Sequence, residues 1–203
     1  MIELIVATKN KGKAKEFQEI FQPLGFEVKT LLDFPDVPDI EETGTTFSEN
    51  AVLKAKGIAG HFNRIVAADD SGLIVDALGG KPGIFSARYA GPQKDDEANI
   101  QKVLSELKDV PDEKRTARFH CSLALVIPGR QPVVFEGTCE GKILREKRGN
   151  NGFGYDPVFY VPSLGKTMAE LTPEQKNKIS HRRQAINKLY QWLKNEFAKG
   201  EII

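Results

Sequence analysis

The pattern of apolar and polar positions predicts alternating strands and helices in the first part of the chain. Met1–Thr8 is an apolar run typical of a buried strand, and Phe26–Leu31 predicts a second strand. Between them, Asn10 can cap a helix whose apolar positions recur at helical spacing, namely Ala14, Phe17, Phe21 and Leu24. An early strand–helix–strand order is typical of α/β proteins.

The next segment predicts a second helix and a short strand. Thr46 and Glu49 form a capping-box pattern, which opens a helix that runs through about His61. Ile65–Ala68 then has the composition of a short buried strand. Because Asp and Gly favour turns, we expect the sequence Asp69-Asp70-Ser71-Gly72 to break this strand.

The second half predicts a long hairpin between helices. Asp95–Leu107 has a helical pattern. Thr116–Ile127 and Val133–Ile143 alternate and flank a Pro-Gly turn, which predicts a hairpin. Thr172-Pro173-Glu174 starts a short helix, and Ser180 can cap the last one.

Strands and helices mix throughout, so we predict an α/β fold with a long mixed sheet flanked by helices. The early β–α units and the long hairpin indicate a two-lobed molecule with a central cleft. A chain of 203 residues fits one large domain or two small lobes that share a core, and we treat residues 1–203 as a single domain.

Composition narrows the class of protein. The 29 Lys and Arg residues against 28 Asp and Glu give a net charge of +1, which argues against a surface that coats nucleic acid. Cys121 and Cys139 form no CxxC pair, which argues against zinc and favours a reducing compartment. The N-terminal apolar run is too short for a signal sequence, and nothing approaches a membrane span. We therefore expect a cytoplasmic protein without nucleic-acid or membrane partners.

A basic segment lies where the first strand leads into the first helix, and it comprises Thr8, Lys9, Asn10, Lys11, Gly12 and Lys13. Helix N-termini present free N–H groups and the positive end of the dipole, where anions bind. Lysines in a first turn oppose that dipole, so a bound anion would relieve the misfit. The alternative is a solvated basic turn. The segment is not a Walker A loop, because the GxxxxGK[ST] spacing is absent.

Carboxylates cluster in two places. Asp69-Asp70-Ser71-Gly72 follows a buried strand, where paired carboxylates commonly hold a hard cation, although an Asx turn is the alternative. Glu41 and Glu42 precede the second helix, where the dipole alone favours acids. Lys54 lies on the inner stripe of that helix and needs a carboxylate or phosphate partner, unless it snorkels at the edge of the core.

Two segments near the C-terminus offer groups that suit a base. Phe153 stands between glycines and can stack on a base, and Asp156 can accept a hydrogen bond from a base edge. The alternative is a Gly-rich turn with a buried Phe. Ser180-His181-Arg182 and Lys176 form a basic cluster whose donors suit a carbonyl or a phosphate, or else they are ordinary polar surface.

Taken in order, five segments resemble the inosine-triphosphate pyrophosphatase family, the noncanonical purine NTP pyrophosphatases. They are TKNKGK at 8–13, EETGTTFSENAVLKA at 41–55, ADDSGLIVDALGGKPGIFSARYAG at 68–91, FGYDPVF at 153–159 and SHRRQA at 180–185. The resemblance implies a two-lobed α/β fold around a substrate cleft and usually a homodimer. It also implies Mg2+-dependent hydrolysis of ITP, dITP and XTP to the monophosphate and pyrophosphate. Many members have Thr-Gly where this chain has Asn150-Asn151.

The resemblance also implies residue roles. The triphosphate would be bound by Thr8, Lys9, Asn10, Lys11, Gly12, Lys13 and Lys54. Glu41 and Asp70 would bind Mg2+, with Asp70 also the general base, and Ser71 would touch the substrate. The nucleoside end would be held by Phe153, Gly154, Tyr155, Asp156, Lys176, His181 and Arg182.

Two alternative functions stay open. A Maf-type nucleotide pyrophosphatase would have another base preference, and the SHR motif argues against it. A nucleotide-sensing module would bind without turnover, and the intact Asp69, Asp70 and Glu41 argue against that.

Overall fold

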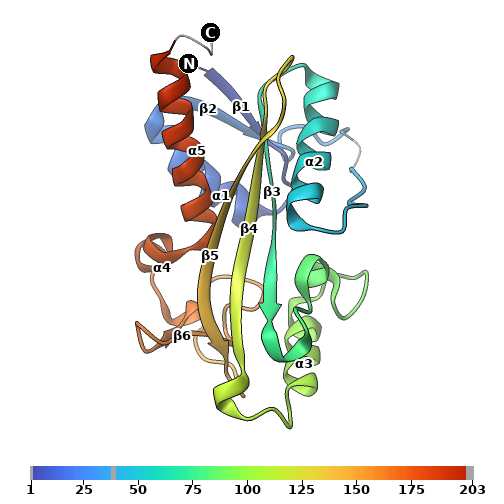
Figure 1. Cartoon of the computed structure of the whole chain (residues 1–203), viewed down its shortest axis with the longest axis vertical. Helices are drawn as coiled ribbons and strands as arrows, with labels where there is room; N and C mark the ends of the chain where they lie inside the picture. Colours follow the sequence, from blue (N-terminus) through green and yellow to red (C-terminus); the bar gives the residue numbers. More distant parts are fainter. Residues whose placement is uncertain (1, 38–39, 200–203) are drawn as a thin grey trace. The chain divides into compact units, whose positions relative to one another are not determined.

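The structure is a computed structural model that describes residues 2–37 and 40–199, without the side chains of Leu24 and Phe197. Seven strands form one sheet in the order β2-β1-β3-β4-β5-β6-β7, with helices around it (Figure 1). The pairs of β1 are parallel and those of β6 are antiparallel, so the sheet is mixed. The predicted α/β fold with a mixed sheet is confirmed.

The chain divides into two compact units. Unit 1 comprises Met1–Asp70, Ser122–Glu136 and Gln184–Ile203, and unit 2 comprises Ser71–Cys121 and Gly137–Arg183. Three strands contribute residues to both units: β3 (Val66–Val75), β4 (Thr116–Val126) and β5 (Val133–Ile143). Each unit has its own hydrophobic core. The expectations of a single domain and of a central cleft stay predictions.

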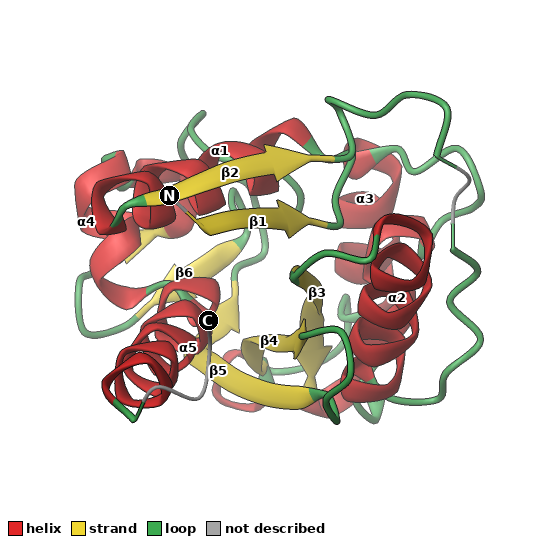
Figure 2. Ribbon diagram, turned by 90° about the horizontal axis from the view of Figure 1, so that it is seen from above, coloured by secondary structure: helices red, strands yellow, loops and turns green. Residues whose placement is uncertain are grey.

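Unit 1 begins with the predicted strand–helix–strand. β1 (Ile2–Val6) pairs in parallel with β2 (Phe26–Thr30), and the two strands lie side by side in Figure 2. Between them, α1 (Lys11–Phe21) begins after Asn10, whose side chain accepts a hydrogen bond from the Lys13 amide. Its apolar face is buried as the spacing predicts, at Ala14, Phe17 and Phe21. Leu24 follows the helix, and its side chain lies outside the described part of the structure.

The second helix, α2 (Phe47–Phe62), begins with the predicted capping box. The Thr46 hydroxyl accepts from the Glu49 amide, and the Glu49 carboxylate accepts from the Thr46 amide. Such reciprocal bonds satisfy two backbone donors at a helix start. The helix then buries Ala51, Ala55 and Ile58 in the core of unit 1, which fixes the side of α2 that carries Lys54.

The unit 2 part of the sheet ends in two short strands. β5 pairs antiparallel with β6 (Phe159–Val161), and β6 pairs antiparallel with β7 (Lys166–Thr167). The predicted helix at 95–107 is α3 (Asp96–Glu106), capped by the Asp95 side chain. Two helices close the chain, α4 (Pro173–Ile179) and α5 (His181–Ala198).

Arg115 is a buried cation in unit 2 that sequence reasoning did not single out. Its guanidinium donates to three backbone carbonyls, those of Leu107, Ile143 and Leu144, at 2.6 to 3.0 Å. Carbonyls at the end of a helix and of a strand lack partners in their own element, and a buried polar group without a partner is costly. Arg115 therefore links the segment after α3 to the end of β5.

The predicted break at Asp69-Asp70-Ser71-Gly72 is wrong, because β3 continues through it to Val75. The two Asp side chains, which favour turns, instead find tertiary partners, described below. Gly72 has no room for a side chain, since a Cβ there would lie 2.4 Å from the Ser86 hydroxyl oxygen. Polar residues can thus occupy the middle of a buried strand when other elements pair with them.

Candidate functional site

In unit 1, β3 carries two buried carboxylates, and two lysines from other elements contact the first of them. A carboxylate oxygen of Asp69 lies 2.9 Å from Lys13 Nζ, and the Asp69 side chain is only 1% exposed. Lys54 Nζ donates to the Asp69 backbone carbonyl at 3.1 Å. The first turn of α1 and the inner side of α2 therefore meet at this residue of β3.

Lys54 lies on the inner side of α2, where we expected it to need a carboxylate or phosphate partner, and it pairs with a carboxylate. Its ammonium lies 2.6 Å from a carboxylate oxygen of Glu42. Burial alone lowers the Lys54 pKa, but the attraction of Glu42 and Asp69 outweighs burial and raises the pKa above its ordinary value. Lys54 is therefore a fixed cation held by two acidic residues.

Asp70 is the second buried carboxylate of β3, with 6% of its surface exposed. Its carboxylate accepts a hydrogen bond from the Asn50 amide at 3.1 Å. Burial raises the Asp70 pKa to about 6, although Lys54, Lys13 and the Asn50 hydrogen bond lower it. The neighbouring Glu42 adds to the rise. A carboxyl group with a pKa near neutrality is suited to accept a proton.

The structure distinguishes the two glutamates that precede α2. Glu42 is partly buried, pairs with Lys54 and acts electrostatically on Asp70, whereas Glu41 is exposed. Sequence reasoning named Glu41 and missed the role of Glu42. Adjacent side chains in an extended segment point to opposite sides, so a Glu-Glu pair alone does not reveal which one faces the buried carboxylates. Glu41 as a metal ligand stays a prediction.

The basic segment at 8–13 is shaped by hydrogen bonds around the start of α1. The Thr8 hydroxyl accepts from the Asn10 amide at 3.1 Å. Lys9 Nζ donates to the Val37 carbonyl at 3.2 Å, while Lys11 is exposed. The segment therefore combines a helix N-terminus with three lysines, of which Lys9 and Lys13 are held by contacts, and this combination suits an anion.

The carboxylates fit Mg2+ in number and type. Among residues 2–37 and 40–199, no group of three or more His, Cys, Asp or Glu side chains is arranged to hold a metal ion. Mg2+, however, is usually bound by one or two carboxylates together with water and phosphate oxygens. Asp70 and Glu42 offer two such carboxylates. Burial raises the pKa of Asp70, so a bound cation would stabilise its charged form.

In unit 2, the Phe153–Asp156 segment is organised around one carboxylate. Asp156 Oδ2 accepts from the Phe153 amide at 3.0 Å and from Lys176 Nζ at 2.7 Å. The Lys176 ammonium also lies 4.9 Å from the centre of the Phe153 ring. Phe153 is 37% exposed, so the alternative of a buried Phe is wrong. The buried aromatic is instead Tyr155, whose hydroxyl donates to the Ser86 carbonyl at 2.8 Å.

The loop that leads into this segment contains a sterically constrained glycine, Gly152, and the Asn150-Asn151 pair that differs from the Thr-Gly of many family members. A Cβ on Gly152 would lie 1.9 Å from an Asp156 carboxylate oxygen, and Gly152 has a φ of +79°. Asn151 is anchored twice, by its amide to the Ala169 carbonyl at 3.0 Å and by its side chain to the Leu171 carbonyl at 3.1 Å. This chain therefore holds the loop with a side-chain bond that a glycine would not supply.

The Ser180-His181-Arg182 segment is buried, so the alternative of ordinary polar surface is wrong. Arg182 Nη2 donates to the Ser71 hydroxyl at 3.1 Å. The His181 imidazole stacks on the Phe119 ring, with centroids 5.1 Å apart and planes 17° from parallel. Phe119 had no signal beyond its place on a buried strand face, so sequence reasoning did not connect it to His181.

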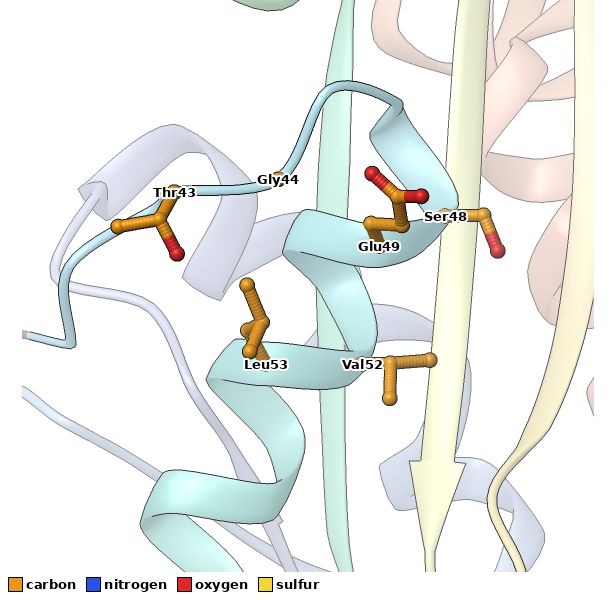
Figure 3. Close-up of a pocket in the computed structure, with 6 residues that line it drawn as sticks. All are labelled: Thr43, Gly44, Ser48, Glu49, Val52 and Leu53. Carbon is orange, nitrogen blue, oxygen red and sulfur yellow. The ribbon is translucent and has the colours of Figure 1, made fainter.

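A surface pocket of about 350 Å³ lies at the start of α2 in unit 1 (Figure 3). It is lined by Thr43, Gly44, Ser48, Glu49, Val52 and Leu53. Glu49 is occupied as the capping-box carboxylate, and none of the predicted site residues lines the pocket. This pocket is therefore separate from the candidate site residues of unit 1.

From the sequence we expect no segment long enough to span a membrane, and the helices of the structure can be compared with that expectation. Within residues 2–37 and 40–199, no helix combines the length and the apolar character needed to cross a bilayer.

Comparison with known proteins identifies the class. The model of the Ham1 family matches residues 4–192, so the chain belongs to the Ham1 family. The predicted family resemblance is confirmed.

Relatives match along most of the chain. A dITP/XTP pyrophosphatase of Halalkalibacterium halodurans is 64% identical over 193 residues, which cover 95% of this chain and 100% of the relative. A dITP/XTP pyrophosphatase of Bacillus subtilis is 58% identical and covers 93% of this chain and 96% of its own length. The solved structure of the Staphylococcus aureus Ham1 protein has a TM-score of 0.87 at 50% identity, covering 96% of this chain and 99% of that one.

Proposed function

We propose that this protein hydrolyses noncanonical purine nucleoside triphosphates such as ITP, dITP and XTP to the monophosphate and pyrophosphate. The observation that carries the proposal is a 64% identical, full-length relative named dITP/XTP pyrophosphatase. The cluster of Lys13, Lys54, Asp69 and Asp70 in unit 1 supports it, because cleavage of a phosphoanhydride depends mainly on positioning and charge stabilisation.

Asp70 and one of the glutamates before α2 would hold Mg2+. We propose Glu42 for this role, with the predicted Glu41 as the alternative, because Glu42 already acts electrostatically on Asp70. When bound, Mg2+ would neutralise phosphate charge and orient the reacting oxygens. The buried Asp70 carboxylate would gain a cation at a place where burial disfavours its charge.

The triphosphate would bind at the start of α1. The N-terminus of the helix and the lysines at 9, 11 and 13 present positive charge there. The neutral members of the predicted set are Thr8, Asn10 and Gly12. Asp69 holds the Lys13 ammonium in place before substrate arrives, which reduces the entropy lost on binding. Lys54, fixed by Glu42, would contact a phosphate from α2.

Asp70 would act as general base. Burial raises the pKa of the metal-free Asp70 to about 6, and Mg2+ at this carboxylate would lower that pKa again. The ionised carboxylate would accept a proton from an attacking water. Asn50 orients the carboxylate through its amide. The proton would pass to a carboxylate oxygen of Asp70 as the water oxygen bonds to the α-phosphorus and pyrophosphate leaves.

The nucleoside end would bind the unit 2 residues. Phe153 offers an exposed ring for stacking, with its backbone held by Asp156 and Lys176. The family resemblance implies four further residues that contact the nucleoside, namely Gly154, Tyr155, Ser71 and His181. Arg182 would contact it as well, and its guanidinium can only donate hydrogen bonds.

Product analysis and one variant test the proposal. The protein is incubated with a panel of NTPs and dNTPs plus Mg2+, and we expect pyrophosphate from ITP, dITP and XTP. Asp70→Asn should abolish most turnover while the folded state persists, because an amide binds Mg2+ poorly and takes up no proton. Orthophosphate as the initial product would refute the reaction. A preference for pyrimidine nucleotides would favour the Maf-type alternative, and binding without any turnover would favour the sensing module.

We also propose a cytoplasmic homodimer, as the family resemblance implies. Two free, buried cysteines agree with a reducing compartment. Sedimentation at micromolar concentration tests the dimer, and a monomer there would refute it.

A further inference from the structure

The tip of the Phe153–Asp156 segment is tied to the first turn of α3. The backbone amide of Gly154 donates to a carboxylate oxygen of Asp96 at 2.8 Å. Gly154 lies between the exposed Phe153 ring and the buried Tyr155, so the bond fixes the backbone next to the ring. Asp96, the first residue of α3, is far from this segment in sequence and was not a predicted site residue.

A second contact joins the same two parts of unit 2. Lys147 Nζ lies 2.6 Å from a carboxylate oxygen of Glu97, which follows Asp96 on α3. Both side chains of this pair are about half exposed, so the pair contributes little to stability by itself. The first turn of α3 nevertheless holds the loop at two points, through Glu97 at Lys147 and through Asp96 at Gly154.

The backbone of the tip needs an anchor from outside. Gly152 and Gly154 have φ angles of +79° and +58°, a region that glycine enters without steric cost and also leaves easily. Asn151 anchors the base of the loop on the Ala169 and Leu171 carbonyls. Asp96 supplies an anchor at the other end, beside Phe153.

The acidic residues in the first turn of α3 could also be explained by the helix dipole. Carboxylates at a helix N-terminus are favoured by the dipole alone. Asp95 already performs the capping, because its side chain accepts from the Ala98 amide at 2.9 Å. The Asp96 carboxylate instead accepts from the amide of a different segment.

We infer that Asp96 is a positioning residue for the nucleoside, acting through the Gly154 amide on the Phe153–Asp156 segment. This inference rests on the proposed function, because it assigns the nucleoside end to that segment. Without the Asp96 bond, the tip samples conformations in which Phe153 is not placed for stacking. The apparent affinity for the nucleotide is then the intrinsic affinity multiplied by the fraction of molecules in the binding-competent conformation.

The test compares four full-length proteins: wild type, Asp96→Ala, Asp96→Asn and Asp95→Ala. We measure KM and kcat for dITP with Mg2+, the Kd of inosine monophosphate by calorimetry, and Tm. Loss of one hydrogen bond to a carboxylate predicts a rise of roughly five- to tenfold in KM and in the Kd of Asp96→Ala, with kcat changed by less than about twofold. Asp96→Asn keeps an acceptor oxygen and should stay within about twofold of wild type.

Asp95→Ala is the matched control, since it removes the helix cap but leaves the Gly154 bond. It should lower Tm without changing KM or Kd. Unchanged KM and Kd in Asp96→Ala would overturn the inference, as would an equal rise in Asp95→Ala or no rescue by Asp96→Asn. A wild type that hydrolyses no dITP would defeat the proposed function, while the calorimetric comparison still decides the role of Asp96. A wild type that binds no inosine monophosphate overturns the inference.

Discussion

Lys13 Nζ lies 2.9 Å from a carboxylate oxygen of Asp69, which joins the first turn of α1 to the buried part of β3. The amide of the same Lys13 donates to the Asn10 side chain that caps the helix. The lysine is therefore fixed at both its backbone and its ammonium group. Asp69 thus orients a proposed phosphate-binding cation rather than occupying a turn.

Asp69→Asn should weaken phosphate binding. The amide keeps the shape of the side chain but removes the charge that holds Lys13, and a hydrogen bond between charged groups is worth about 1.5–3 kcal/mol. We expect kcat/KM for dITP to fall by about tenfold or more, mainly through KM. Glu19→Gln, which removes the exposed Lys15–Glu19 pair of the same helix, is the control and should change nothing. Equal kinetics in the two variants would remove Asp69 from substrate binding.

The two glutamates before α2 should behave differently. Glu42→Gln removes the partner of Lys54 and a charge that acts on Asp70. We expect kcat/KM to fall by roughly tenfold or more and the Mg2+ requirement to rise, on the scale of a lost charged pair. Glu41→Gln should stay within about twofold of wild type, because an exposed charge is largely solvated. The opposite ranking, measured over a Mg2+ titration, would assign the Mg2+ to Glu41.

Arg115 should be a stability determinant of unit 2. Arg115→Met leaves three backbone carbonyls without their donor, and each unpaired buried group costs about 1–3 kcal/mol. We expect the free energy of unfolding in urea to fall by about 3 kcal/mol, since some carbonyls will reach water. Arg145→Gln alters a half-exposed arginine nearby and should cost less than about 1 kcal/mol. A cost for Arg115→Met no greater than that control would show that the carbonyls find other partners.

Much of the fold was predictable because its signals are local. The caps at Asn10, Thr46 and Asp95 each involve a side chain and an amide within three residues, and all three helices begin within one residue of the predicted start. The continuation of β3 through Asp69 and Asp70 was not predictable in this way. Its partners Lys13 and Asn50 come from other elements, and only the folded chain brings them to the strand.

The same distinction applies to the candidate site. Motifs in the sequence identified Asp156, Lys176, His181 and Arg182 as candidates. In unit 2, Lys176 donates to Asp156, His181 stacks on Phe119, and Arg182 donates to Ser71. The residues that position them carry no motif of their own. Phe119 is one apolar position among many on β4, and Asp96 is one acid among three at a helix start.

Arg182 should determine base preference. It is 3% exposed and donates to the Ser71 hydroxyl, so its guanidinium is fixed within unit 2. Hypoxanthine and xanthine carry a carbonyl at position 6 and an N–H at position 1. Adenine carries an amine at position 6 and an acceptor nitrogen at position 1. Because arginine only donates, it matches a 6-carbonyl and opposes the adenine amine.

The acceptor for the N1–H would be Asp156 or a backbone carbonyl of its loop. Each mismatch with adenine leaves a buried polar group unpaired, at a cost of about 1–3 kcal/mol, so two mismatches give roughly 10^2- to 10^4-fold discrimination if they add. Arg182→Ala should therefore narrow the ratio of kcat/KM for ITP over ATP, mainly through loss of ITP activity. Arg183→Ala removes an equal charge from the adjacent residue and should leave that ratio unchanged. If Arg182→Ala lowers kcat/KM for ITP and ATP by the same factor, the guanidinium is a general positioning charge, and the base must be read by other groups.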